Sequence, residues 1–192
     1  MILEWRVYGL VNRGIRDLML AKGGEPLWRS VREKAGVDTD DFLSMQAYDD
    51  AVSVSLVGVA ADEIGVSTEE LLREFGRHWV LFTGNEGYGP LMDVSGDTLH
   101  AFLNNLDQMH ARVRVSMPEL DPPSFRVEEL APEKLRIEYF SSRQGLAGMV
   151  IGLLEGLGER FGESVSAVHV EAKQSVDEPD VFELVLQTDL SP

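Results

Sequence analysis

Three prolines, Pro118, Pro122 and Pro123, divide the chain into two parts with different hydrophobic periodicity. Before them, apolar residues recur every three or four positions, the spacing that gives a helix one buried face. Soon after them, apolar residues alternate, as in Phe125 and Val127, which is typical of strands. Because proline lacks an N–H donor and restricts the residue before it, such a run ends helix formation. We therefore expect an α+β fold with a helical N-terminal part.

Capping residues and glycines set the expected boundaries of the elements. Asp49 and Asp50 can cap one helix, and Ser67 with Glu70 forms a capping-box pattern at the start of another. The expected helices cover residues 8–20, 26–36, 38–44, about 50–64, 67–79, 98–114 and 146–161, with a loop at 84–89. Strands at 125–127, 135–139, 165–170 and 181–186 would form a roughly four-stranded antiparallel sheet.

The composition excludes several classes of function. The chain has 192 residues and no cysteine, which excludes disulfides, thiolate zinc sites, iron–sulfur clusters and c-type haem. Its formal net charge of −16 argues against a nucleic-acid partner and favours a basic protein surface. The sequence shows neither a signal-peptide pattern nor an apolar run long enough for membrane insertion. We expect a cytoplasmic protein.

The negative charge is uneven along the chain. Residues 101–150 hold six cationic and seven acidic side chains, and are therefore nearly neutral. Their cations, which include Arg112, Arg136 and Arg143, could receive an anionic ligand. They could equally pair with nearby acidic side chains.

His110 is the histidine that needs interpretation. It shares a helical stripe with Leu103, Leu106, Met109 and Val113, so its side chain should face the interior. It could be a hydrogen-bonded core residue. Alternatively, a neutral imidazole on an apolar helix face is suited to ligate haem iron, which also requires cations or hydroxyls for the haem propionates.

Such donors follow the prolines. In an extended segment, Tyr139, Ser141 and Arg143 occupy alternate positions and project to the same side. A phenol, a hydroxyl and a guanidinium would then converge, which suits a pair of carboxylates. A solvated strand face is the alternative interpretation.

Together these motifs resemble the haem–nitric oxide/oxygen binding (H-NOX) family, the sensor domain also found in the β-subunit of soluble guanylate cyclase. The resemblance covers nearly the whole chain and implies a single domain over 1–192, with a distal helical lobe of about 1–65, a proximal lobe of about 66–192, and haem between them. Its motifs are VYGLVN at 7–12, GYG at 87–89, NLD-x-x-HARV at 105–113, PPSF at 122–125, Y-x-S-x-R at 139–143 and GLA-x-MV-x-GLL at 145–154.

The resemblance implies roles residue by residue. His110 would be the proximal ligand and sole protein ligand of a noncovalent haem b. Tyr139, Ser141 and Arg143 would bind the propionates, and Pro123 would press on the porphyrin. The implied distal residues are Trp79 and Met149, with Leu10 or Val11 against the ring.

Ligand choice follows from one departure from the oxygen-binding members, which carry a distal tyrosine five residues after the motif arginine. That position is Gly148 here. Bound oxygen is retained by a hydrogen-bond donor, whereas nitric oxide needs none, so we expect selectivity for nitric oxide, with carbon monoxide a weaker ligand. Trp79 has an indole N–H, but the resembling members share this tryptophan.

The implied function is therefore a nitric oxide sensor without catalysis of its own. Nitric oxide would weaken the bond between His110 and iron, relax the haem against Pro123 and let the lobes rotate. We expect no output domain in this chain, and hence an effector such as a histidine kinase, a cyclic-di-GMP enzyme or a guanylate cyclase. The alternatives are a haem enzyme, such as a peroxidase or a nitric oxide scavenger, and an interaction domain without haem. No distal pair of histidine and arginine is evident for a peroxidase, although Arg77 and His78 are adjacent in sequence.

Overall fold

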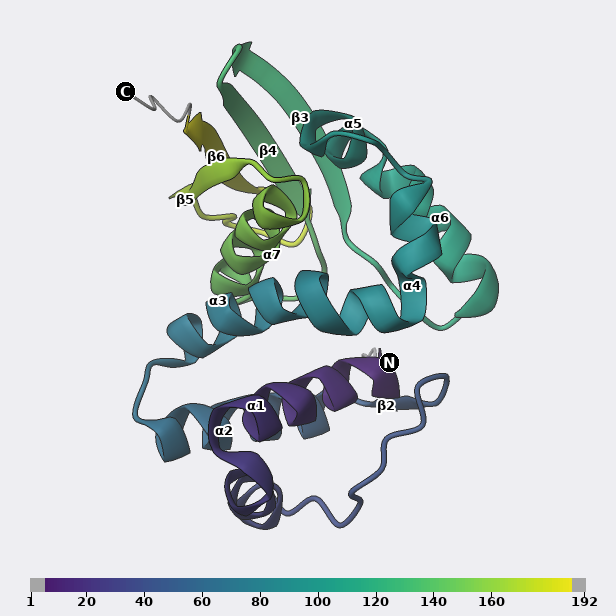
Figure 1. Ribbon diagram of the computed structural model, residues 1–192, viewed down its shortest axis with the longest axis vertical. Helices are drawn as coiled ribbons and strands as arrows, with labels where there is room; N and C mark the ends of the chain where they lie inside the picture. The colour runs from purple at the N-terminus through teal and green to yellow at the C-terminus, as the bar shows by residue number, and fades with distance from the viewer. Residues whose placement is uncertain (1–5, 188–192) are drawn as a thin grey trace.

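The computed structural model describes residues 6–187, except for the side chains of residue 6 and residues 83–87, and its fold is α+β as expected (Figure 1). Four strands form one antiparallel sheet and two short strands pair near the N-terminus. In chain order the elements are β1 (Arg6–Tyr8), α1 (Gly9–Lys34), β2 (Ala47–Asp49), α2 (Asp50–Ile64), α3 (Thr68–His78), the π-helical turn η1 (Trp79–Thr83), α4 (Gly84–Asp93), α5 (Leu99–Asn104), α6 (Leu106–Ser116), β3 (Ser124–Ala131), β4 (Lys134–Phe140), α7 (Ala147–Arg160), β5 (Ser164–Glu171) and β6 (Asp180–Gln187).

The N-terminal helices begin and end where the capping signals predict. Helix α1 is broken at Gly24, whose φ of 67° lies in the left-handed region that glycine adopts without strain. The expected helices at 8–20 and 26–36 are therefore the two arms of one bent helix. The Asp49 side chain caps α2 by accepting from the amide of Ala51. Ser67 and Glu70 form the complete capping box of α3.

The expected helix at 38–44 is wrong, because this segment is a loop anchored by tertiary contacts. Phe42 is fully buried in the core, and the amide of Leu43 donates to the Tyr48 hydroxyl at 3.0 Å. These contacts replace helical hydrogen bonds. The loop leads into β2, which pairs with β1 in a small sheet that the sequence analysis did not predict.

The expected loop at 84–89 is also wrong, since α4 begins at Gly84 and continues the helix from α3 through η1. A helix that continues an existing one avoids the cost of nucleation, which outweighs the low propensity of its glycines. The expected helix at 98–114 is two helices, α5 and α6, which meet at Asn105. The Asn105 side-chain amide donates to the Ser95 carbonyl at 2.9 Å.

The main sheet has the strand order β3-β4-β6-β5, with every neighbouring pair antiparallel. Its inner face carries Leu135, Ile137, Phe182 and Leu184, all buried against helices α7 and α5. The outer face carries ion pairs such as Arg126–Glu138, together with the exposed Val168 and Val185. The period-2 pattern read from the sequence is thus the inner and outer faces of this sheet.

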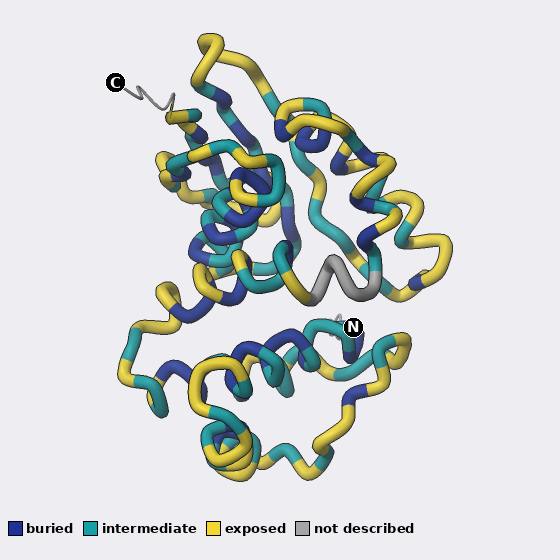
Figure 2. Tube along the Cα trace, viewed as in Figure 1, coloured by how far each residue is buried: buried dark blue, intermediate teal, exposed yellow. Residues whose placement is uncertain are grey.

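Two hydrophobic clusters divide the interior (Figure 2). The N-terminal cluster joins α1, α2 and α3 and includes Ile15, Trp28, Leu56 and Phe75. The sheet cluster joins the sheet with α5 and α7. In Figure 1, α3 and α4 cross the molecule between α1 and α2 on one side and the sheet with α7 on the other.

No single helix among residues 6–187 is long and apolar enough to cross a membrane. The segments Asp50–Ile64 and Thr68–Phe82 are long and apolar enough for a membrane span only when they are taken together, and the chain bends by 108° between them.

Candidate functional site

The predicted site residues separate onto the two clusters. Val11, Trp79 and Met149 pack on the N-terminal cluster, although Met149 belongs to α7. Tyr139 is a buried member of the sheet cluster. The residues assigned to the distal side of a haem therefore lie on one cluster, and a residue assigned to its carboxylates lies on the other.

His110 lies on α6 and faces the segment that follows the prolines. Its Nδ1 is 3.1 Å from the carbonyl oxygen of Pro123, and its ring centroid is 5.9 Å from that of Phe125. Because a carbonyl oxygen only accepts, Nδ1 carries the proton and donates, which leaves the lone pair on Nε2. Burial lowers the pKa of His110 and favours the neutral imidazole.

This state of His110 is the one that a metal ligand requires. Within residues 6–187, no hydrogen bond to its Nε2 is found, while its Nδ1 is held by a backbone carbonyl. Metal-ligating histidines usually donate their second N–H in this way, which fixes the tautomer and the ring orientation. Pro123, predicted to press on a porphyrin, thus also orients the imidazole through its carbonyl group.

A second contact ties α6 to the sheet beside His110. The Asp107 carboxylate accepts a hydrogen bond from the backbone amide of Phe125 at 2.8 Å. Asp107 lies one helical turn before His110, and Phe125 lies two residues after Pro123. Two hydrogen bonds, His110 to Pro123 and Phe125 to Asp107, therefore hold α6 against the segment that leads into β3 and fix the position of the imidazole.

Tyr139, Ser141 and Arg143 come together where β4 ends. The Arg143 amide donates to the Ser141 hydroxyl oxygen at 3.1 Å, and Tyr139 is the last but one residue of β4, two positions before Ser141. Burial raises the pKa of Tyr139, so its phenol stays protonated and able to donate. The structure thus groups the three predicted residues, with Ser141 almost wholly buried between its neighbours.

The guanidinium of Arg143 reaches across to the N-terminal helices. Its Nε lies 3.1 Å from Oδ2 of Asp50 at the start of α2, and its Nη1 donates to the Asp121 carbonyl oxygen at 3.1 Å. The other oxygen of Asp50, Oδ1, is buried and has no hydrogen-bond partner among the described residues. This arrangement holds carboxylate oxygens beside the guanidinium.

The distal position named from the sequence, Gly148, faces a helix. A Cβ atom at Gly148 would overlap the backbone carbonyl oxygen of Glu69, so this residue lets α7 approach α3. The next residue, Met149, packs on the N-terminal cluster, as does Trp79, whose ring lies 6.0 Å from that of Phe75. Leu10 is half-buried near the start of α1.

These residues fit a haem group. A neutral imidazole with an available Nε2 can ligate iron, and the hydroxyl, phenol and guanidinium near β4 can bind the two propionates. Val11, Trp79 and Met149, which are partly buried on the N-terminal cluster, would offer apolar surface to the macrocycle. Other cations of the 101–150 segment pair locally instead, as Arg136 does with Glu138 and Glu171.

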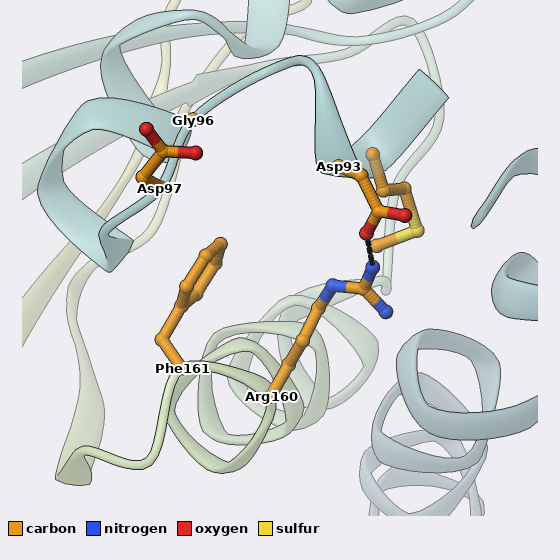
Figure 3. Close-up of a pocket in the computed structure, with 6 residues that line it drawn as sticks. Asp93, Gly96, Asp97, Arg160 and Phe161 are labelled. Atoms are coloured by element: carbon orange, nitrogen blue, oxygen red, sulfur yellow. Dashed lines mark hydrogen bonds and ion pairs between the residues drawn. The ribbon is translucent and has the colours of Figure 1, made fainter. Parts of the chain in front are cut away.

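A separate pocket of about 440 Å³ contains none of the predicted residues (Figure 3). Asp93 and Arg160 form an ion pair of 2.5 Å at its edge, and Phe161 faces Asp97 across it. Its lining residues are Met92, Asp93, Gly96, Asp97, Arg160 and Phe161.

Sequence reasoning missed Asp50 and Lys173, which contact the Tyr139–Arg143 segment from far along the chain. Asp50 is 93 residues from Arg143, and Lys173 is 32 residues from Ser141. The sequence predicts Asp50 only as a possible helix cap and predicts no role for Lys173. Neither residue is thereby predicted to contact this site.

The curated relatives that the chain matches include soluble guanylate cyclases. The chain is 29% identical to the soluble guanylate cyclase gcy-31 of Caenorhabditis elegans over 155 residues, which is 81% of this chain and 22% of that protein. It is 33% identical to the rat guanylate cyclase soluble subunit beta-2 over 102 residues, which is 53% of this chain and 15% of that protein. The chain thus spans less than a third of the length of these relatives.

Solved structures share the fold. An H-NOX protein from S. oneidensis in the Fe(II)NO ligation state has a TM-score of 0.84 at 18% identity, covering 95% of this chain and 100% of that one. The Fe(II) unliganded H-NOX protein from K. algicida has a TM-score of 0.78 at 21% identity, covering 96% and 98%. The Haem-NO-binding family model matches residues 8–169. The chain therefore belongs to the haem-NO-binding (H-NOX) family of haem-binding sensor domains.

Proposed function

We propose that this chain is a haem-based nitric oxide sensor that holds one noncovalent haem b between its two clusters. The observation that carries the proposal is the state of His110, whose Nδ1 donates to the Pro123 carbonyl while its Nε2 has no hydrogen bond among the described residues. When bound, a ferrous haem with one protein ligand supplies an open position for nitric oxide and, more weakly, for carbon monoxide. Tyr139, Ser141 and Arg143 bind the two carboxylates.

The surroundings of the open position favour nitric oxide over oxygen. Val11 and Met149 are apolar and offer no hydrogen-bond donor, so a ligand that needs one is retained poorly. Trp79 is the one donor among the predicted distal residues, and its ring packs beside Phe75 on the N-terminal cluster. Exclusion of oxygen follows from this composition.

Signalling begins at His110. Binding of nitric oxide to a haem held by His110 would weaken the hold on the imidazole, which would let α6 move relative to Pro123 and β3. The contacts that would transmit the movement are the Asp107–Phe125 bond and the ion pair of Arg143 with Asp50. The second contact joins α2 to the loop after β4, and so links the proposed lobes of about 1–65 and 66–192. A rotation of one lobe against the other would therefore change this ion pair. Helix α3 contacts α1 and α2 on one side and α7 on the other.

The output belongs to an effector, either fused or separate. Guanylate cyclases, histidine kinases and cyclic-di-GMP enzymes are the expected classes, and the net charge of −16 suits a basic docking surface. We place the protein in the cytoplasm. A peroxidase-like role receives no support from Arg77 and His78, because Arg77 pairs with Glu159 at 2.5 Å and His78 stacks on Phe82.

The visible absorption spectrum of the reduced protein tests the proposal. We expect a five-coordinate ferrous spectrum that air does not change and that nitric oxide shifts at once. A stable oxygenated spectrum would contradict the selectivity. Absence of a Soret band after haem is supplied would contradict haem binding altogether.

A further inference from the structure

A lysine from a distant segment holds the Ser141–Arg143 backbone. Lys173 lies in the loop between β5 and β6, and its Nζ donates to the carbonyl oxygens of Ser141 at 2.6 Å and Arg143 at 2.5 Å. These are the backbone groups of two residues whose side chains form the proposed carboxylate site. Two of the three ammonium donors are therefore used to fix this short segment.

Lys173 is itself anchored to the sheet. Its backbone amide donates to Oδ1 of Asp180 at 3.2 Å, and the His169 Nε2 is 2.9 Å from the same oxygen. Asp180 is the first residue of β6 and lies opposite Tyr139 in the strand register. The lysine thus links the segment after β4 to the strand that flanks Tyr139.

The Lys173 ammonium also places a positive charge beside the Ser141–Arg143 segment, and it leaves the side-chain donors of Ser141 and Arg143 unoccupied by the lysine. The Ser141 hydroxyl and the Arg143 guanidinium remain separate from the lysine contacts, which involve backbone carbonyls alone. Lys173 is half-buried, so its charge is screened less than that of an exposed lysine. The Lys173 charge thus lies against the backbone of the two residues whose side chains form the proposed carboxylate site.

We propose that Lys173 is a positioning residue for the haem carboxylates, fixing the Ser141–Arg143 backbone and raising the positive potential there. The inference rests on the proposed function, since it concerns the same carboxylate site. Lys173 acts through Ser141 and Arg143.

The test is a titration of the haem-free protein with haem and, separately, with haem dimethyl ester, which lacks free carboxylates. Lys173→Met removes the charge and the donors, and should raise the Kd for haem about tenfold. Lys173→Arg should restore most of the affinity. Lys134→Met is the matched control, because Lys134 pairs with Glu183 on the sheet, and it should change the Kd by less than about twofold.

The ester separates positioning from general stability. The penalty of Lys173→Met should disappear with the ester, because no carboxylate then needs the site. An equal penalty with both compounds, or no penalty with haem, would overturn the role of Lys173. If Lys173→Met does not fold, Lys173→Gln, whose amide keeps two N–H donors without the charge, is judged by the same two outcomes. Failure of the unmodified protein to bind haem would instead overturn the proposed function, and this inference with it.

Discussion

At the scale of single residues, His110 combines the two interpretations that its sequence position left open. One nitrogen is satisfied by a backbone carbonyl, as in a core histidine, and the other is available, as in a metal ligand. Periodicity predicted that the ring faces inward. Periodicity could not predict the tautomer. The Pro123 carbonyl oxygen that fixes it is 13 residues away in sequence and is brought to Nδ1 only by the path of the loop after α6.

Met149 is the residue whose replacement should change ligand choice. Met149→Tyr brings a phenol donor to a position on the N-terminal cluster, so the reduced variant should keep an oxygenated spectrum in air for minutes or longer. Gly148→Tyr is the comparison, because its side chain would collide with the Glu69 backbone and weaken the fold without conferring oxygen binding. Stable oxygen binding by Gly148→Tyr alone would show that the distal assignment is wrong.

His78 should make stability depend on pH. Burial lowers its pKa below the ordinary value of 6.5, and nearby Asp17 opposes this shift. Its Nε2 is buried and has no hydrogen-bond partner in the part of the chain that the structure describes. The unfolded chain therefore takes up a proton at higher pH than the folded chain, so the free energy of unfolding falls as pH drops below about 6.5. Urea unfolding at pH 8 and at pH 5.5 measures the loss of unfolding free energy between these two pH values. This loss should be smaller for His78→Gln than for the unmodified protein. Identical losses would contradict this.

At the scale of elements, glycines determine how α3 and α7 pack. A Cβ atom at Gly152 would overlap the Arg73 carbonyl oxygen, and one at Gly76 would overlap the Met149 carbonyl oxygen. Ion pairs such as Arg77–Glu159 flank this contact. The structure thus identifies α3 as the helix against which the glycines of α7 pack.

Gly152→Ala should therefore destabilise the protein by about 2 kcal/mol, because neither backbone can give way without separating the helices. Gly58→Ala is the control. Gly58 lies in α2, and among the described residues no atom beyond its own helical neighbours lies within 4 Å of an added Cβ, so alanine should be neutral or stabilise by up to about 1 kcal/mol. Urea unfolding measures both, and a Gly152→Ala protein as stable as the parent would refute the packing argument.

The elements predicted from sequence were those with a strong local signal. The capping box at Ser67 and the alternation in β4 and β6 depend on neighbouring residues, and both were located well. The loop at 38–44 and the helix α4 depend on tertiary contacts or on a preceding helix, so local patterns misassigned them. Strands β1 and β2 are three residues each, too short for a periodic signal.

At the scale of the molecule, the candidate site joins segments that are distant in sequence. Local motifs identified His110 and the Tyr139–Arg143 segment. The contacts of Arg143 with Asp50 and of Lys173 with that segment could not be found in this way, since they appear only when β6 and α2 are brought beside the end of β4. Side-chain roles were thus predictable where a motif carried them, and their supporting contacts were not.

The central claim is that the whole molecule closes around one haem held by His110, and a haem titration tests it most directly. The unmodified chain should bind one haem per chain with a Soret band, while His110→Gly should bind haem only when imidazole is added. His100→Gly, which changes an exposed histidine on α5, should behave like the parent. Retention of haem by His110→Gly without imidazole, with an unchanged spectrum, would contradict the account.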